Sequence, residues 1–281
     1  MNNLIIVVNK DKDYTSRDVV NKLGKILGIK KIGHTGTLDP MATGVLVCLT
    51  GKYTKLVDLI TSLEKEYIAT IKLGIKTDTL DITGNIIEKN DNYKIDELNL
   101  KNVLNSFLGE YEQTVPVFSA IHVNGKRLYE YARENKEVEL PKRKIFISDI
   151  ELLNYREDLI KFRVVVSKGT YIRSLIQDIC SSLNVIGTMS ELIRTKQGIF
   201  NIENSYTLRD LEVNNYKTLK LEEVIDLQIV DLDDNIAKKV INGNKLELNY
   251  DGYILFRKDD KDVALYYFEN KIGKLKILFT F

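Results

Sequence analysis

The sequence predicts an α+β fold built on a mixed, largely antiparallel sheet, followed by a small β-rich segment at the C-terminal end. Stretches that alternate apolar and polar residues, typical of half-buried strands, occur among stretches with helical apolar spacing. The two kinds do not follow the regular strand–helix–strand spacing of a parallel sheet. From about residue 236 onward, short apolar stretches separated by polar turns replace this mixture.

The first sixty residues contain three predicted elements. Residues 4–8 (LIIVV) form an apolar run that predicts a buried strand. A helix follows, capped by Thr15 or Ser16 and ended by Gly28. Its buried face consists of four apolar residues at helical spacing: Val19, Val20, Leu23 and Leu27. After a loop rich in glycine, the apolar residues 45–49 predict a second strand.

The middle of the chain continues in the same manner. Two strands are predicted from alternating apolar residues: Tyr67, Ala69, Ile71 and Leu73 in one, and Phe162, Val164 and Val166 in the other. A helical stripe closed by Gly109 lies between them: Leu100, Val103, Leu104, Phe107 and Leu108. Asn124 and Gly125 predict a tight turn. A helix is expected after Gly169 and Thr170, with one apolar face: Ile172, Leu175, Ile176, Ile179 and Leu183.

Two domains are predicted, residues 1–230 and residues 231–281. The acidic stretch 214–234 is the expected boundary. The later segment contains YILF, DVALYYF and KLKILFTF, which read as strands. It is short for an independent core, so we expect it to form a small β-domain packed on the main body.

Composition places the chain among ordinary globular proteins, with 44% hydrophobic and 29% charged residues. No apolar run is long enough to span a bilayer, and the N-terminal apolar stretch lacks the flanks of a signal peptide. Cys48 and Cys180 are isolated in apolar surroundings, which predicts two core thiols in a reducing, cytoplasmic compartment.

The net charge of +1 conceals an uneven distribution. Basic residues exceed acidic ones by four in residues 1–60 and by four in residues 161–198, whereas residues 199–235 have six more acidic than basic ones. Such segregation permits a basic face that binds a polyanion. An unevenly charged solvated surface explains the counts equally well.

Known cofactor signatures are missing from the sequence. Neither a phosphate-binding P-loop nor a dinucleotide fingerprint occurs, and His34 and His122, the only histidines, have no cysteine or histidine neighbours at zinc-binding spacing. We therefore expect no metal site and an activity that needs no cofactor.

The most informative segment is GHTGTLDPMATGVL, residues 33–46. Its glycines, threonines and proline indicate an irregular loop, and Pro40 forces the preceding Asp39 out of helical conformation. Gly36 and Gly44 permit close backbone approach or positive φ. Such a loop can hold one carboxylate at the mouth of a pocket. Alternatively, Asp39 caps the turn through its own backbone.

This loop resembles the signature of the TruB family of pseudouridine synthases, whose pattern is close to GHxGTLDPxAxGxL. Further segments resemble other blocks of that family, in the same order: VVNKDKDYTS around Lys10, residues 65–84, residues 115–133, residues 168–179 and residues 191–200. Together they extend from about residue 4 to residue 200.

The resemblance implies a pseudouridine synthase catalytic domain with a small PUA-like RNA-binding domain at the C-terminal end. It implies isomerisation of uridine to pseudouridine at position 55 of the tRNA T-loop, after the base has been flipped out of its stack. The expected partners are the T-loop and T-stem of tRNA and, through C-terminal lysines, its acceptor stem. The family also implies a monomer that does not bind membranes.

The same resemblance assigns roles to individual residues. Asp39 is implied to be the nucleophile, with Arg173 keeping its carboxylate ionised and aimed. Tyr67 is implied to pack against the target base and is a candidate for removal of the C5 proton. The remaining substrate-binding residues that it implies are Lys10, which supports the active-site turn, His34, which helps to hold the T-loop open, and Tyr171 and Leu192, which line the base pocket.

Three points stay open at this stage. The sequence does not decide whether Asp39 adds to C6 of the base or leads to a glycal at the ribose. It also leaves a non-catalytic RNA-binding protein and a glycoside hydrolase as alternatives, the second with Asp78 or Asp81 as the additional carboxylate. Finally, Phe118 and His122 stand where the family usually has tyrosine and lysine.

Overall fold

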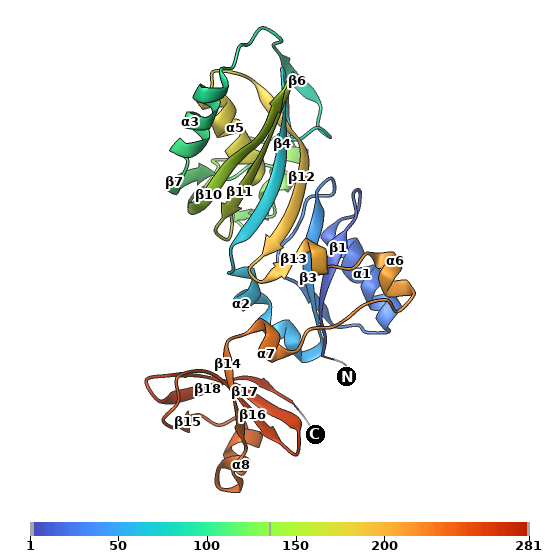
Figure 1. Ribbon diagram of the computed structural model, residues 1–281, viewed down its shortest axis with the longest axis vertical. Helices are drawn as coiled ribbons and strands as arrows, with labels where there is room; N and C mark the ends of the chain where they lie inside the picture. The colour runs from blue at the N-terminus through green and yellow to red at the C-terminus, as the bar shows by residue number, and fades with distance from the viewer. Residues whose placement is uncertain (1–2, 135, 280–281) are drawn as a thin grey trace.

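The computed structural model describes residues 3–134 and 136–279, which form a nine-stranded sheet and a separate five-stranded sheet near the C-terminus (Figure 1). The large sheet has the order β1 (Ile5–Lys10), β3 (Thr43–Thr50), β12 (Gly187–Gln197), β4 (Lys65–Leu73), β11 (Leu159–Val166), β10 (Lys142–Arg156) and β7 (Gly109–Thr114), with β2 (Ile32–His34) beside β3 and β13 (Phe200–Asn201) beside β12. In the described part of this sheet only β12 and β3 pair in parallel. The predicted α+β class with a largely antiparallel sheet is confirmed.

The predicted N-terminal helix is α1 (Ser16–Leu27). Thr15 caps it, because its hydroxyl accepts from the amide of Asp18 while the Asp18 carboxylate accepts from the amide of Thr15. The helix ends at Gly28, whose φ of 65° is the left-handed conformation that glycine adopts without strain. Both predicted helix ends are therefore confirmed.

One face of the sheet is covered by α3 (Glu97–Ser106) and α5 (Ile172–Ser182), which lie beside β10, β11 and β4 (Figure 1). The alternating residues predicted for β4 and β11 are buried against these helices, as expected. The prediction for α3 was wrong at its end: the helix stops at Ser106, and Leu108 is 47% exposed. Gly109, with φ 95°, begins β7 instead of closing the helix, because the chain must reverse into the sheet there.

Short elements fill the connections between the long strands. Asn124 and Gly125, both with positive φ, form the predicted tight turn between β8 (His122–Val123) and β9 (Lys126–Arg127). The other connecting elements are η1 (Gly51–Leu56), α2 (Val57–Thr61), β5 (Ile75–Thr77), β6 (Ile86–Lys89), α4 (Leu128–Arg133), η2 (Ile202–Asn204), α6 (Leu208–Glu212) and α7 (Leu221–Val224).

The C-terminal sheet has the order β14 (Leu227–Asp231), β16 (Gly252–Lys258), β17 (Lys261–Glu269), β18 (Ile272–Leu278) and β15 (Leu246–Glu247). The three long apolar stretches predicted as strands are β16, β17 and β18. The segment predicted to be strand-rich from about residue 236 also contains a helix, α8 (Asp234–Ile241), which lies before these strands. Asp233 caps this helix, and Val240 is its fully buried residue.

The two sheets share one apolar cluster. Val47 and Leu49 of β3 belong to the same cluster as Leu255, Leu265 and Ile277 of the C-terminal sheet. In addition, the ring of Tyr53 meets that of Phe279 edge to face, with centroids 6.0 Å apart. The C-terminal sheet is therefore packed on the end of the main body that lies away from α3 and α5 (Figure 1).

Cys48 and Cys180 are both buried and free. Burial raises the pKa of each thiol to about 12. The prediction that both are core residues is confirmed. Among the described helices, none is long and apolar enough to cross a membrane.

Candidate active site

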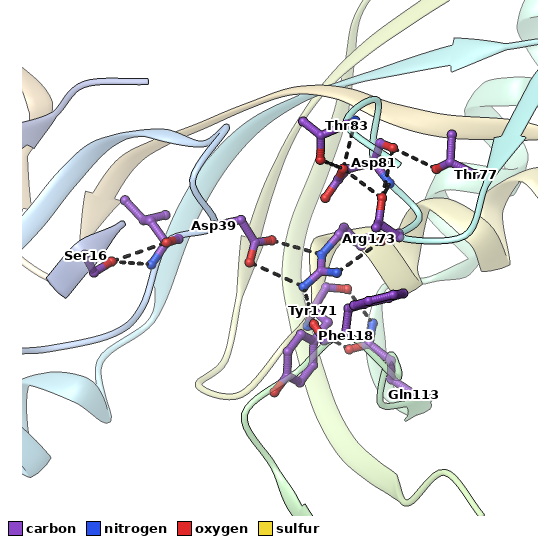
Figure 2. A network of polar contacts seen from close by, with 11 residues as sticks. Ser16, Asp39, Thr77, Asp81, Thr83, Gln113, Phe118, Tyr171 and Arg173 are labelled. Atoms are coloured by element: carbon purple, nitrogen blue, oxygen red, sulfur yellow. Dashed lines mark hydrogen bonds and ion pairs between the residues drawn. The ribbon is translucent and has the colours of Figure 1, made fainter. Parts of the chain in front are cut away.

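Asp39 lies in the loop that connects β2 to β3. The amide of Ala42 donates to the carbonyl of Asp39 at 3.0 Å, so Asp39 begins a β-turn with Pro40 at its second position. Proline suits that position because its φ is already fixed near the required value. The carboxylate of Asp39 points away from this turn, toward Arg173 (Figure 2).

The residues on either side of Asp39 are held by the N-terminal part of the chain. Ser16 Oγ accepts from the amide of Leu38 at 2.9 Å and lies 3.3 Å from its carbonyl (Figure 2). Lys10 Nζ donates to the carbonyl of Pro40 at 3.1 Å, and to two carbonyls of the adjoining residues 11–14. Asp39 therefore projects from a backbone that is fixed immediately before and after it.

Two side chains of strand β12 hold the loop through hydrogen bonds to its backbone carbonyls. Arg194, 1% exposed, donates from Nε to the carbonyl of Val45 at 2.6 Å and from Nη2 to that of Gly36 at 3.1 Å. Gln197 Nε2 likewise donates to the carbonyl of Thr35 at 2.9 Å. A Cβ atom at Gly44 would lie 2.3 Å from the Arg194 carbonyl, so only glycine permits β3 to lie this close to β12.

Arg173 faces Asp39 from the first turn of α5. Its Nε lies 2.9 Å from Asp39 Oδ2, and its Nη2 lies 3.3 Å from Oδ1, a bidentate arrangement (Figure 2). The remaining donors reach the carbonyls of Thr79 at 3.1 Å and Phe118 at 3.0 Å. The Arg173 side chain is 6% exposed and that of Asp39 is 33% exposed, so the carboxylate remains accessible from the cavity.

Tyr171 is positioned by Gln113 of β7. Gln113 Oε1 accepts from the Tyr171 amide at 2.8 Å, and its Nε2 donates to the Tyr171 carbonyl at 3.1 Å (Figure 2). Gln113 is 1% exposed and also donates to the hydroxyl of Tyr111 at 3.2 Å. One buried amide therefore satisfies both polar groups of the Tyr171 backbone, at the residue that caps α5.

Asp39, Tyr171 and Arg173 lie in the wall of a cavity of about 390 Å³. Asp39 and Arg173 lie on one part of its wall, and Tyr67, Tyr171 and Leu192 contribute aromatic and aliphatic surface. Tyr67 and Leu192 are each 7% exposed. The cavity therefore combines one ion pair with aromatic and aliphatic surface and several polar side chains, an arrangement typical of a site that binds a small organic group.

Lys65 adds a buried positive charge to the cavity wall. Its Nζ donates to the carbonyls of Thr61 at 2.8 Å and Leu63 at 2.7 Å. Burial, reinforced by the nearby charge of Arg194, lowers the pKa of Lys65 to about 8. Burial likewise lowers the pKa of Lys10 to about 8.

The structure brings five of the seven residues expected from the sequence to this cavity: Asp39, Tyr67, Tyr171, Arg173 and Leu192. Lys10 is outside the cavity lining, completely buried beneath the loop. His34 is half-buried in β2, also outside the lining, with its Nδ1 accepting from the amide of Gly36 at 3.4 Å. Burial lowers the pKa of His34.

Among the described residues, Asp39 is the only carboxylate that lines the cavity. Asp81 instead accepts from Thr79 and Thr83, and Asp78 accepts from Asn85. The geometry does not provide the second carboxylate that a glycoside hydrolase requires. In the part of the chain that the structure describes, no group of three or more His, Cys, Asp or Glu side chains is arranged to hold a metal ion.

Several residues that build this site were not predicted from the sequence, among them Ser16, Lys65, Gln113 and Arg194. Lys65 and Arg194 belong to segments that resemble family blocks, so those blocks gave a signal for them. Gln113 and Ser16 gave none, because a lone polar residue on a strand or in a first helical turn is usually a surface residue. Phe118, noted as a departure, contributes its carbonyl to Arg173, a contact that does not depend on its side chain.

Residues 24–172 match the family model described as TruB family pseudouridylate synthase, N-terminal domain. The chain belongs to the TruB family. Residues 173–236 match the model described as tRNA pseudouridylate synthase B C-terminal domain. The TruB match covers Asp39, Tyr67 and Tyr171, while Arg173 and Leu192 fall within the second model. The chain is thus a pseudouridine synthase.

Whole-chain similarities agree with this membership. The chain is 43% identical to a tRNA pseudouridine synthase B of Mesoplasma florum over 95% of its own length and 94% of that protein. It is also 43% identical to a tRNA pseudouridine synthase B of Clostridium tetani, over 96% and 93% of the two chains.

Solved structures show the same fold at lower identity. A chain from a Cbf5–Nop10–Gar1 complex superposes with a TM-score of 0.69 at 28% identity, covering 94% of this chain and 78% of that one. A chain from an H/ACA RNP bound to a substrate RNA containing 2′-deoxyuridine superposes with a TM-score of 0.70 at 24% identity, covering 99% and 85%.

Proposed function

We propose that this chain converts the uridine at position 55 in the T-loop of tRNA into pseudouridine, with Asp39 as the nucleophile. The observation that carries the proposal is the position of the Asp39 carboxylate, held by Arg173 in the wall of a cavity that also has aromatic and aliphatic surface. The full-length relatives from Mesoplasma florum and Clostridium tetani are tRNA pseudouridine synthases, which supports tRNA as the substrate.

The reaction breaks the bond between C1′ of the ribose and N1 of uracil and forms a bond between C1′ and C5. The C5 proton is lost and N1 gains a proton, so the product is an isomer of the substrate. A nucleophilic carboxylate divides this exchange into easier steps. The ion pair and the hydrogen bond from Arg173 fix the direction of the Asp39 carboxylate, which a nucleophile needs.

The cavity must also retain the detached uracil. Tyr67 and Leu192 supply apolar walls that exclude water, and water would otherwise hydrolyse the intermediate. Tyr67 is placed to pack against the base and to assist removal of the C5 proton. Tyr171 completes the wall beside Arg173, with its backbone fixed by Gln113.

Lys10 and His34 act outside the cavity in this proposal. Lys10 fixes the carbonyl of Pro40 and therefore the turn that carries Asp39. His34 lies on the strand that leads into the loop, where it contacts the opened T-loop beside the flipped nucleotide.

We further assign RNA binding to residues 231–281, as a PUA-like domain that contacts the phosphates of the acceptor stem. From residue 236 onward, nine lysine and arginine residues outnumber six acidic ones, and three of the lysines (Lys245, Lys274 and Lys276) line one cavity with Tyr267 and Glu269. The proposed form of the enzyme is a cytoplasmic monomer that uses no cofactor.

Tritium release from tRNA labelled at C5 of uridine tests the proposed reaction. The wild-type protein should release about one equivalent of tritium per tRNA, and Asp39→Ala should release none while still binding tRNA. Asp58→Ala removes an equal charge from an exposed position in α2 and should behave as the wild type does.

Two results would reject parts of the proposal. A folded wild-type protein that binds tRNA without releasing tritium would be an RNA-binding scaffold rather than an enzyme. Full activity in a tRNA whose position 55 is not uridine would show that another nucleotide is the target.

A further inference from the structure

Ser119 lies in the wall of the active-site cavity, one residue after the carbonyl that Arg173 contacts. Its residue exposure is 7%. Its amide donates to the carbonyl of Val117 at 2.9 Å, and its carbonyl accepts from the amide of Tyr129 at 3.1 Å. The backbone of Ser119 is therefore satisfied within the protein and links the cavity wall to α4.

The hydroxyl of Ser119, unlike its backbone amide and carbonyl, has no hydrogen-bond partner in the described part of the protein. Among residues 3–134 and 136–279, Ser119 Oγ is the only buried side-chain nitrogen or oxygen atom without a hydrogen-bond partner. An unpaired buried hydroxyl lowers the stability of the folded protein, and buried polar groups in proteins are nearly always paired. An alanine at this position would avoid the cost, so packing alone does not account for serine here.

We propose that Ser119 is a substrate-positioning residue whose hydroxyl pairs with the flipped uridine. This inference rests on the proposed function of the cavity and extends it. Ser119 lines the same cavity as Asp39 and follows Phe118, whose carbonyl accepts from the Arg173 nitrogen that also contacts Asp39. A uridine that enters the cavity to reach Asp39 therefore also lies close to Ser119. Because the Ser119 Oγ is covered in this conformation, pairing with a bound nucleoside requires a turn about the Cα–Cβ bond to another staggered rotamer.

A serine hydroxyl both donates and accepts, and it can rotate about one bond to meet its partner. The uracil ring and the ribose each offer matching groups: the carbonyls and N3–H of the base, and the 2′-hydroxyl of the sugar. The shared chemistry is one hydrogen bond to the target nucleoside. This bond would form only when the uridine is flipped into the cavity, so its free energy would contribute to base flipping and orientation.

The test compares Ser119→Ala with the wild type by tritium release under steady-state and single-turnover conditions. We expect kcat/KM to fall about tenfold, the effect of losing one hydrogen bond between neutral groups. The melting temperature of the free variant should equal or exceed that of the wild type, because the substitution removes an unpaired buried oxygen. A serine with a purely structural role would instead lower the melting temperature when replaced.

Ser190→Ala is the matched control, since Ser190 Oγ donates to the Thr70 carbonyl at 3.1 Å outside the cavity. It should leave kcat/KM within twofold of the wild type. A second substrate, a T-arm RNA with 2′-deoxyuridine at the target position, shows whether Ser119 pairs with the uracil base or with the ribose 2′-hydroxyl. The tenfold difference between Ser119→Ala and the wild type disappears on this RNA if the ribose is the partner and persists if the base is.

The inference is overturned if Ser119→Ala keeps wild-type kcat/KM on both RNAs, or if its loss of activity accompanies a lower melting temperature. In both cases an active wild type would leave the proposed function intact. An inactive wild-type protein that is folded and binds tRNA would overturn the proposed function, and the role of Ser119 with it.

Discussion

Arg173 joins Asp39 through two contacts, from Nε to Oδ2 at 2.9 Å and from Nη2 to Oδ1 at 3.3 Å, although the two residues are 134 positions apart in sequence. Their contact ties the loop between β2 and β3 to the first turn of α5. Because Arg173 also donates to the carbonyls of Thr79 and Phe118, four segments of the chain meet at one guanidinium (Figure 2).

Arg173→Lys should lower kcat at least about 100-fold, while tRNA affinity changes little. A lysine ammonium cannot reproduce the planar, bidentate contact, so the carboxylate loses its direction. Single-turnover tritium release and filter binding measure the two effects separately. Arg163→Lys provides the control, because Arg163 also contacts carboxylates (Glu66, Asp149 and Glu151) but lies outside the cavity. A normal kcat in Arg173→Lys would show that direction is set by other groups.

Gln113→Leu should reduce kcat/KM about tenfold by releasing the backbone of Tyr171. It should also lower the free energy of unfolding by about 1–3 kcal/mol, because the Tyr171 amide loses its partner, while the Tyr171 carbonyl keeps its bond from the Leu175 amide. Activity is measured well below the melting temperature, where the variant is folded. Gln177→Leu removes a comparable 2.8 Å bond to the Gly187 carbonyl without touching Tyr171, and an equal loss of activity in both variants would contradict the prediction.

Lys65→Met should change how stability depends on pH. Burial lowers the pKa of Lys65 from 10.5 to about 8, so between these values the unfolded chain binds more protons than the folded one. The free energy of unfolding contributed by Lys65 therefore rises with pH across this window, by at most about 1.4 kcal/mol per pH unit. The variant lacks this rise.

Urea unfolding at pH 7.5, 8.5 and 9.5 measures the difference in stability between wild type and Lys65→Met. We expect this difference to grow in favour of the wild type as the pH increases. Lys31→Met makes the same change of charge at an exposed position and controls for net charge. A difference that stays constant over this range would contradict a lowered pKa at Lys65.

The double substitution of Lys274 and Lys276 by glutamine should weaken binding of full-length tRNA. It should also reduce the slope of log affinity against log salt by about 2, since each phosphate contact contributes about 0.9. Both lysines line a cavity with Tyr267, and Lys276 Nζ lies 5.3 Å from the centre of that ring. Lys258→Gln is the control, because Lys258 is already paired with Asp234.

A T-arm hairpin without the acceptor stem distinguishes this contact from those at the active site. Its affinity should be the same for the double variant and the wild type. An equal loss of affinity for both RNAs would indicate that the lysines contact the T-arm. Unchanged affinity for both RNAs would show that these lysines do not take part in RNA binding.

Much of the local structure could be predicted from the sequence. Thr15 and Gly28 mark the ends of α1 because capping and positive φ are properties of a few neighbouring residues. Alternation predicted the buried face of β4, since a strand presents every second side chain to the same side. Prediction was less successful where such signals compete, as at Leu108 and α8, because apolar residues near a chain reversal fit more than one structure.

The sequence by itself determined the irregular loop around Asp39 and Pro40, and its motifs pointed to the family. The family resemblance implied that Arg173 meets the Asp39 carboxylate. Only the tertiary structure decided the geometry of that contact, the position of Gln113 on the Tyr171 backbone, and the place of Lys10 beneath Pro40 rather than in the cavity. Local sterics and periodicity act over a few residues. Contacts between distant segments depend on the order and register of β3, β12, β4 and β7 in one sheet, which no short stretch of sequence specifies.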